Sequence, residues 1–150
     1  MDRREMLKGA AGGLILAAAG NTAFAADHDK HQHALHKHTQ KNQSLIDAAA
    51  DGVKMGQACL HHNHELLSKG ENKGLAVCAM RVSEMIAACS AIEQLANYNS
   101  AHLPKMARVV MDVCTDCEKE CRKFENEHEI CKQTADSCAA CFNECKKIAA

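Results

Sequence analysis

Two stretches of the sequence decide the fold: residues 114–121 read CTDCEKEC, and residues 138–145 read CAACFNEC. In both, the second cysteine follows the first by three residues, and the third follows by four more. Residues at these steps lie on one face of an α-helix, one above the other. Cys131 stands seven residues before Cys138 and extends the second row by two turns. The spacing therefore predicts two helices, each with a row of sulfur atoms along one face.

The same periodicity, followed outward from these stretches, predicts four helices, over about 45–69, 73–98, 103–125 and 128–147. Ser44 is the expected N-cap of the first helix, with Asp47 three residues on, and Gly70 is expected to end that helix. Pro104 falls in the first turn of the third helix, where its missing N–H does no harm.

Each predicted helix has one inward stripe, and cysteine occurs on all four stripes. The stripes consist of Leu45, Ala48, Gly52, Met55, Cys59 and Leu66; of Cys78, Val82, Met85, Cys89, Ile92 and Ala96; of Leu103, Ala107, Val110, Cys114, Cys117, Cys121 and Phe124; and of Cys131, Thr134, Cys138, Cys141, Cys145 and Ile148 or Ala149. Connections of only about 3 to 5 residues join antiparallel neighbours. The expected fold class is therefore all-α, an antiparallel up-down-up-down four-helix bundle with a Cys-lined core.

The N-terminal residues are expected to lie outside this bundle. Residues 2–8 read DRREMLK and resemble a twin-arginine export signal, an apolar stretch follows to about Gly20, and residues 23–25 form a small-x-small cleavage site. A membrane anchor is less favoured, because a span needs roughly 20 apolar residues. We expect a signal peptide at 1–25, a His-rich flexible tail at 26–43 and the bundle domain at 44–150. The mature protein would be periplasmic or extracellular, without a membrane span.

Composition narrows the function. The chain of 150 residues contains 10 Cys, 10 His and 7 Met, but no Trp and only 3% aromatic residues. The core therefore cannot be built on large rings, and the cysteines need a role in disulfides, metal binding or catalysis. The formal net charge of −1 argues against a nucleic-acid partner, which would select a basic surface. The His-rich tail is either a weak metal-collecting arm or a solvated linker.

Several kinds of site compete for the cysteines. Disulfides are the usual explanation in an exported chain, but sulfurs on one helix face do not readily aim at one another. A c-type haem needs Cys-x-x-Cys-His, and Glu118 and Phe142 stand where the histidine would be. Structural zinc takes four ligands, and ten cysteines in a column exceed one or two such sites. A di-iron bundle needs Glu-x-x-His pairs, which the stripes lack. An iron–sulfur cluster normally takes its ligands from a loop wrapped around it.

Cu(I) fits the pattern best. It is a soft ion that prefers thiolate and thioether ligands. It accepts two-coordinate sites and bridging thiolates, so a column of cysteines could hold about one ion per thiol. Counting residues outward from each loop predicts which side chains of neighbouring helices lie at the same level along the bundle. The predicted pairs are Cys121 with Cys131, Cys114 with Cys138, Cys78 with Cys121, Cys89 with Met111, and Cys59 with Val82.

The two ends of the bundle differ in the side chains expected there. One end is apolar and reads as a plug made by Leu45, Ile92, Leu103, Val110 and Ile148. The other end carries His61, His62, His64 and His128 beside three of the cysteines. We expect His62 and His128 to line a mouth through which copper enters, and His61 and His64 to be surface residues. Met55 and Met85 are either further soft ligands or core filler.

Residues 138–147 read CAACFNECKK. This ending, together with the predicted four-helix bundle, its inward cysteine pairs and the twin-arginine signal, resembles the bacterial copper storage protein family. The resemblance covers about residues 44–150. The resemblance implies a homotetrameric protein that is not an enzyme and stores multiple Cu(I) ions for copper-dependent enzymes or copper chaperones, or for detoxification. It assigns the metal to Cys59, Cys78, Cys89, Cys114, Cys117, Cys121, Cys131, Cys138, Cys141 and Cys145. A disulfide-stapled structural or interaction protein and an iron–sulfur electron carrier are the alternatives.

Overall fold

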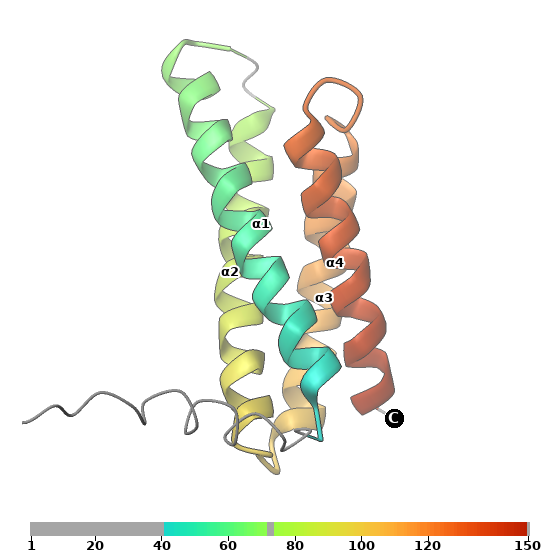
Figure 1. Ribbon diagram of the computed structural model, residues 1–150. Helices are drawn as coiled ribbons and strands as arrows, with labels where there is room; N and C mark the ends of the chain where they lie inside the picture. Colours follow the sequence, from blue (N-terminus) through green and yellow to red (C-terminus); the bar gives the residue numbers. More distant parts are fainter. Residues whose placement is uncertain (1–40, 72–73, 150) are drawn as a thin grey trace, which may run out of the picture. The chain divides into compact units, whose positions relative to one another are not determined.

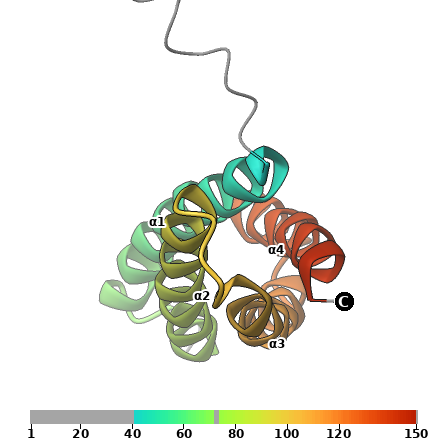
Figure 2. The same ribbon diagram turned by 90° about the horizontal axis from the view of Figure 1, so that it is seen from below.

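The computed structural model describes residues 41–71 and 74–149. This part of the chain consists of four helices without a strand: α1 (Gln43–Ser68), α2 (Leu75–Asn97), α3 (Leu103–Arg122) and α4 (Glu129–Ile148). α1 and α3 each pack against both α2 and α4 (Figures 1 and 2). The expected all-α, antiparallel four-helix bundle is thereby confirmed. The predicted signal peptide and residues 26–40 of the predicted tail lie outside the described residues.

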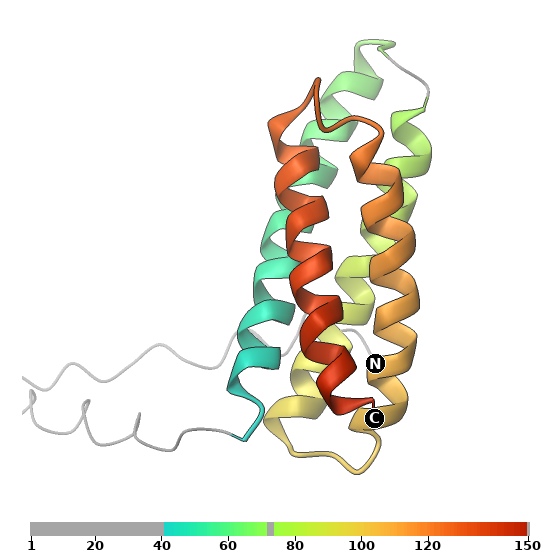
Figure 3. The ribbon, with the colours of Figure 1, turned by 90° about the vertical axis from the view of Figure 1, so that its right-hand side faces the viewer.

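The two ends of the bundle are built differently. The α1–α2 and α3–α4 connections lie together at one end, and the α2–α3 connection lies at the other, beside the start of α1 and the end of α4 (Figures 1 and 3). We call the first the histidine end, because His62 and His128 lie there. At that end α1 projects beyond the start of α2 (Figure 1).

The start of α1 differs from the prediction. Asn42, not Ser44, stands at the N-cap, and its side chain makes no capping bond. Its amide instead donates to the carbonyl of Ala96 at 3.3 Å and to Oδ1 of Asn99 at 3.1 Å. The prediction of Ser44 as N-cap was wrong because these bonds to the end of α2 hold Asn42 in place, and the helix then begins at Gln43.

Two other helix-end predictions are confirmed. Gly70 follows α1 with φ +79°, a left-handed conformation that glycine adopts without steric cost. Pro104 lies in the first turn of α3. α3 ends at Arg122 rather than at about 125, and Phe124 is buried in the turn that follows.

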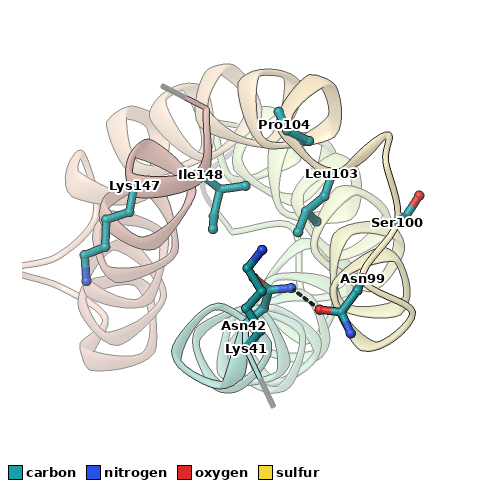
Figure 4. Close-up of a pocket in the computed structure, with 8 residues that line it drawn as sticks. All are labelled: Lys41, Asn42, Asn99, Ser100, Leu103, Pro104, Lys147 and Ile148. Carbon is teal, nitrogen blue, oxygen red and sulfur yellow. Dashed lines mark hydrogen bonds between the residues drawn. The ribbon is translucent and has the colours of Figure 1, made fainter. Parts of the chain in front are cut away.

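The end opposite the histidines is filled with apolar side chains, as expected. Leu45, Ile92, Leu103 and Val110 are buried there, and Ile148 is half-buried. Outside this layer lies a pocket of about 270 Å³ (Figure 4). Its lining combines apolar and polar side chains, namely Lys41, Asn42, Asn99, Ser100, Leu103, Pro104, Lys147 and Ile148.

α2 is apolar on more than one side. Among the described helices it is the one long and apolar enough to cross a membrane by length and composition. Nine of its residues, however, are buried in the bundle, and a core helix has the same composition. α2 approaches α1 closely where α1 carries Gly56, because a Cβ atom there would lie 2.7 Å from Cγ1 of Ile86.

Candidate metal centre

All ten cysteines are buried, and all are free thiols. α1 supplies one, α2 two, α3 three and α4 four, and each is at most 1% exposed. Because all four inward stripes carry them, their sulfur atoms share the bundle axis rather than the surface. They occupy the volume that large apolar side chains would fill in an ordinary bundle.

Three of the thiols meet near the histidine end. We call Cys59, Cys78 and Cys131 triad 1; their Sγ atoms lie within 4.8 Å of one another and come from α1, α2 and α4. Cys59 Sγ is 3.9 Å from Cys131 Sγ, and Cys78 Sγ is 3.6 Å from Cys121 Sγ of α3. All four helices therefore bring sulfur to this level.

A second group lies deeper in the bundle. Triad 2 consists of Cys89, Cys114 and Cys141, from α2, α3 and α4, whose Sγ atoms also lie within 4.8 Å of one another. Cys89 Sγ is 3.8 Å from Cys141 Sγ, and the Cys89 thiol donates to Sδ of Met85 at 3.6 Å. A thioether thus adjoins the three thiols.

The remaining thiols link the triads. Cys117 interacts with both Cys121 and Cys138, and Cys138 interacts in turn with Cys114 of triad 2. Cys145 extends the series beyond Cys141. The sulfur atoms therefore form one continuous column through the core.

Hydrogen bonds within this column lower the pKa of some cysteines and raise the pKa of others. Hydrogen bonds from Cys121 and Cys131 hold the pKa of Cys78 well below its ordinary value. Hydrogen bonds from Cys114 and Cys145 do the same for the pKa of Cys141. Those from Cys121 and Cys138 lower the pKa of Cys117 to about 5. Each of these thiols gives up its proton more readily than an isolated cysteine, because neighbouring thiols donate hydrogen bonds to its thiolate form.

The neighbouring thiols show the opposite shift. Hydrogen bonds with Cys114 and Cys141, together with burial, raise the pKa of Cys89. The pKa values of Cys114, Cys121, Cys131, Cys138 and Cys145 are also raised. A cation that enters the column would neutralise buried negative charge and displace these protons.

His62 and His128 lie together, as expected. Their ring centroids are 4.8 Å apart, and the ring planes meet at 68° in an edge-to-face contact. His62 is half-buried, and its Nε2 atom is buried without a hydrogen-bond partner among the described residues. His61 is exposed, with Nδ1 3.8 Å from Glu65, and His64 is exposed. Of the four histidines near this end, the structure thus brings His62 and His128 together beside triad 1.

The two methionines differ in position. Met85 is fully buried, with its sulfur at Cys89. Met55 is half-buried, and its carbonyl accepts a hydrogen bond from Thr134 at 3.2 Å.

The sequence interpretation missed Asn63. Its side chain is fully buried, and its amide Nδ2 donates to Cys59 Sγ at 3.7 Å. Asn63 stands between two histidines in a polar run, and so it reads as a surface residue. The available signal was its position four residues after Cys59, on the same helix face.

The expected levels along the column are partly right. Cys78 lies beside Cys121, as predicted. Cys59 lies with Cys78 instead of Val82, and Cys89 lies with Cys114 instead of Met111, each a helical turn from the predicted level. Counting from the loops failed for Cys59 because α1 overhangs the start of α2 at the histidine end (Figure 1).

The fold and the site together define a class of protein: a four-helix bundle with thiol groups positioned to bind metal in its core. The family model for copper storage protein matches residues 38–150. The chain therefore belongs to the copper storage protein family, which confirms the resemblance drawn from its motifs. That family consists of storage proteins rather than enzymes, and it supports copper storage as the general function of this chain.

The chain is also similar to a curated protein of Bacillus subtilis (strain 168), the uncharacterized cysteine-rich protein YhjQ. The two are 25% identical over 111 residues, which is 74% of this chain and 98% of that protein.

Proposed function

We propose that this protein stores multiple Cu(I) ions on the ten thiols of its core. The observation that carries the proposal is the continuous column of buried sulfur, with a triad at each of two levels. Cu(I) is a soft cation that prefers thiolate ligands. Sulfur atoms from different helices, within 4.8 Å of one another, can share a metal ion without a large rearrangement. Bound copper would tie the helices together.

Charge favours a high capacity. A Cu(I) ion carries one positive charge and a thiolate one negative charge. A column loaded with about one ion per thiolate is therefore neutral, which removes the cost of burying ten separate charges. A dication at the same ratio would leave excess positive charge in an apolar core. The column thus suits a monovalent soft ion.

Copper enters at the histidine end in this proposal. His62 and His128 lie beside triad 1, and the opposite end is filled by apolar side chains. An imidazole nitrogen is an intermediate ligand for copper, and Nε2 of His62 makes no hydrogen bond to residues 41–71 or 74–149 that it would have to give up. Copper would pass from His62 and His128 to triad 1 and then along the column toward Cys145, with Met85, and more weakly Met55, as further soft donors.

The biological setting follows from features outside the bundle. The twin-arginine-like signal supports export to the periplasm or beyond, and export in a folded state would let the thiols be loaded before they meet an oxidising compartment. We propose a storage protein, not an enzyme, that supplies copper-dependent enzymes or chaperones or keeps copper harmless. A homotetramer is the assembly that the family resemblance supports.

A thiol count followed by a copper titration tests this function. The protein is purified without reductant, its free thiols are counted after denaturation, and the native chain is titrated anaerobically with Cu(I) against a chromophoric chelator. We expect ten free thiols and many copper ions per chain. A variant with Cys138, Cys141 and Cys145 each changed to Ser is the matched control, and its capacity should fall.

Other outcomes would support the alternatives. Few free thiols together with no copper uptake would contradict storage and favour a disulfide-stapled protein. A brown protein containing acid-labile sulfide would favour an iron–sulfur carrier.

A further inference from the structure

The two triads lie at different depths. His62 follows Cys59 of triad 1 by three residues, and His128 precedes Cys131 by three, so both lie about one helical turn from the triad. Triad 2 is displaced along α2 by the eleven residues from Cys78 to Cys89, which is about 16 Å at the rise of an α-helix. An ion in triad 1 is therefore closer to the histidine end than an ion in triad 2.

The triads also differ in the groups that touch their sulfurs. In triad 1 the amide of Asn63 donates to Cys59 Sγ at 3.7 Å. In triad 2 the neighbour is the thioether of Met85, 3.6 Å from Cys89 Sγ. Triad 1 thus has an amide donor directed at one of its sulfurs, beside the thiol of Cys121. Triad 2 has the thioether of Met85 beside it.

Burying the polar side chain of Asn63 costs free energy that its hydrogen bonds only partly offset. It is fully buried, and its Oδ1 has no hydrogen-bond partner among the described residues. An unpaired buried carbonyl destabilises the fold, whereas a leucine of similar size would not. The buried hydroxyl of Thr134 offers a contrast, because it donates to the carbonyls of Met55 and Ile130 and so has a structural explanation. The side-chain hydrogen bond that Asn63 makes is to a sulfur.

A donor on a ligand sulfur changes how that sulfur binds metal. The N–H group draws electron density from the thiolate and makes it a weaker donor toward copper. The sulfur is also held in one orientation by the amide. Both effects favour an ion that binds and leaves readily.

The surroundings of triad 2 favour retention. Met85 supplies a soft donor to an ion held by Cys89, Cys114 and Cys141. The space is also tight, since a Cβ atom at Gly52 would lie 3.2 Å from Cys89 Sγ. An ion here has a thioether beside it and a longer path to the histidine end.

We propose that triad 1 is the exchange site of the column and triad 2 its retention site, and that Asn63 is the positioning residue that makes triad 1 exchange faster. This division of labour rests on the proposed storage of Cu(I). Copper leaves the loaded protein from triad 1 first, and ions deeper in the column follow through it.

Copper release from the loaded full chain tests the inference. The loaded protein is mixed anaerobically with excess bathocuproine disulfonate, and its coloured Cu(I) complex is followed together with the near-ultraviolet absorption of the copper–thiolate bonds. We expect a fast and a slow phase. Asn63→Leu should slow the fast phase about tenfold, because losing this hydrogen bond makes the Cys59 thiolate a stronger donor toward copper, with the slow phase and the total copper unchanged.

Two further variants isolate the cause. Thr134→Val removes another fully buried polar group, one bonded to carbonyls, and should leave both phases unchanged. Met85→Leu keeps the volume but removes the thioether, and should speed the slow phase alone. If Asn63→Leu does not accumulate as folded protein, Asn63→Ala replaces it in the same comparison.

The outcomes separate this inference from the storage function. Wild-type release rates in the Asn63 variant, or equal slowing in Thr134→Val, would overturn the role of Asn63. An effect of Met85→Leu on the fast phase would overturn the assignment of the two sites. A wild-type chain that takes up no copper would instead overturn storage itself.

Discussion

His62 is the side chain on which copper entry depends in the proposed function. It is half-buried, its ring meets His128 edge-on, and its Nε2 atom is buried without a hydrogen-bond partner in the part of the chain that the structure describes. Changing His62 to Ala removes that nitrogen but none of the ten thiols. We therefore expect Cu(I) uptake to slow about tenfold with the final stoichiometry unchanged, as measured by anaerobic stopped-flow absorbance.

His61 offers the matched control for this variant. It is adjacent in sequence but exposed, and its contact is with Glu65. His61→Ala should load at the wild-type rate. Wild-type uptake by His62→Ala, or equal slowing in both variants, would show that the histidines do not guide entry.

Single residues also show which features of the site could be predicted from the sequence. The buried positions of the ten cysteines follow from three- and four-residue spacing, since one helix face must turn inward. Asn63 has the same spacing from Cys59, but asparagine is usually exposed. Its burial is a result of how α1 packs in the bundle, which the local sequence does not determine.

At the scale of the helices, the contact of α1 with α2 depends on Gly56. A Cβ atom there would lie 2.7 Å from Cγ1 of Ile86 and 2.8 Å from Cε of Met85. Alanine favours a helix over glycine by about 1 kcal/mol, but overpacking a core costs about 1–3 kcal/mol. Because Ile86 Cγ1 is not the free end of its side chain, we expect the clash to win. Gly56→Ala should lower the free energy of unfolding of the metal-free protein by about 1 kcal/mol, measured by urea denaturation under reducing conditions.

Ala50→Gly in the same helix calibrates that experiment. Ala50 is exposed, so its replacement reports helix propensity without a packing change. A Gly56→Ala protein at least as stable as the wild type would mean that Met85 and Ile86 move aside at no cost.

The helices were predictable, but some of their ends and some of the levels of the cysteines along the bundle were not. All six predicted stripe residues of α2, from Cys78 to Ala96, are buried. The start of α1 was missed because Asn42 is fixed by bonds to Ala96 and Asn99, more than fifty residues away. The predicted level of Cys59 was one helical turn off. Counting the same number of residues in both directions from a loop assumes that the two helices it joins end at the same height. Long-range bonds and unequal helix ends are tertiary effects that a local pattern does not encode.

At the scale of the whole molecule, the metal-free core must limit its own charge. Ten thiolates in one apolar column would repel one another strongly. Hydrogen bonds between the thiols divide the column into cysteines whose pKa is lowered and cysteines whose pKa is raised. The lowered pKa values belong to Cys59, Cys78, Cys117 and Cys141, and the raised ones to Cys89, Cys114, Cys121, Cys131, Cys138 and Cys145.

This division predicts how the stability of the metal-free protein depends on pH. An unfolded cysteine titrates near 9.0. Between about 5, the folded pKa of Cys117, and 9.0, the unfolded chain holds protons that the lowered-pKa thiols have lost, so stability rises with pH. Above 9.0 the unfolded chain releases protons that the raised-pKa thiols retain when folded, so stability falls. Anaerobic urea denaturation at a series of pH values should show a maximum near 9.

Copper-loaded protein separates the thiols from every other titrating group. Its lysines, carboxylates and histidines outside the column are the same, but its sulfurs are bound to metal and carry no proton to exchange. The fall above pH 9 should therefore disappear on loading if it arises from the column. An equal fall in both forms would assign it to lysine deprotonation at the surface, and a metal-free protein whose stability keeps rising past pH 9 would contradict the retention of protons in the core.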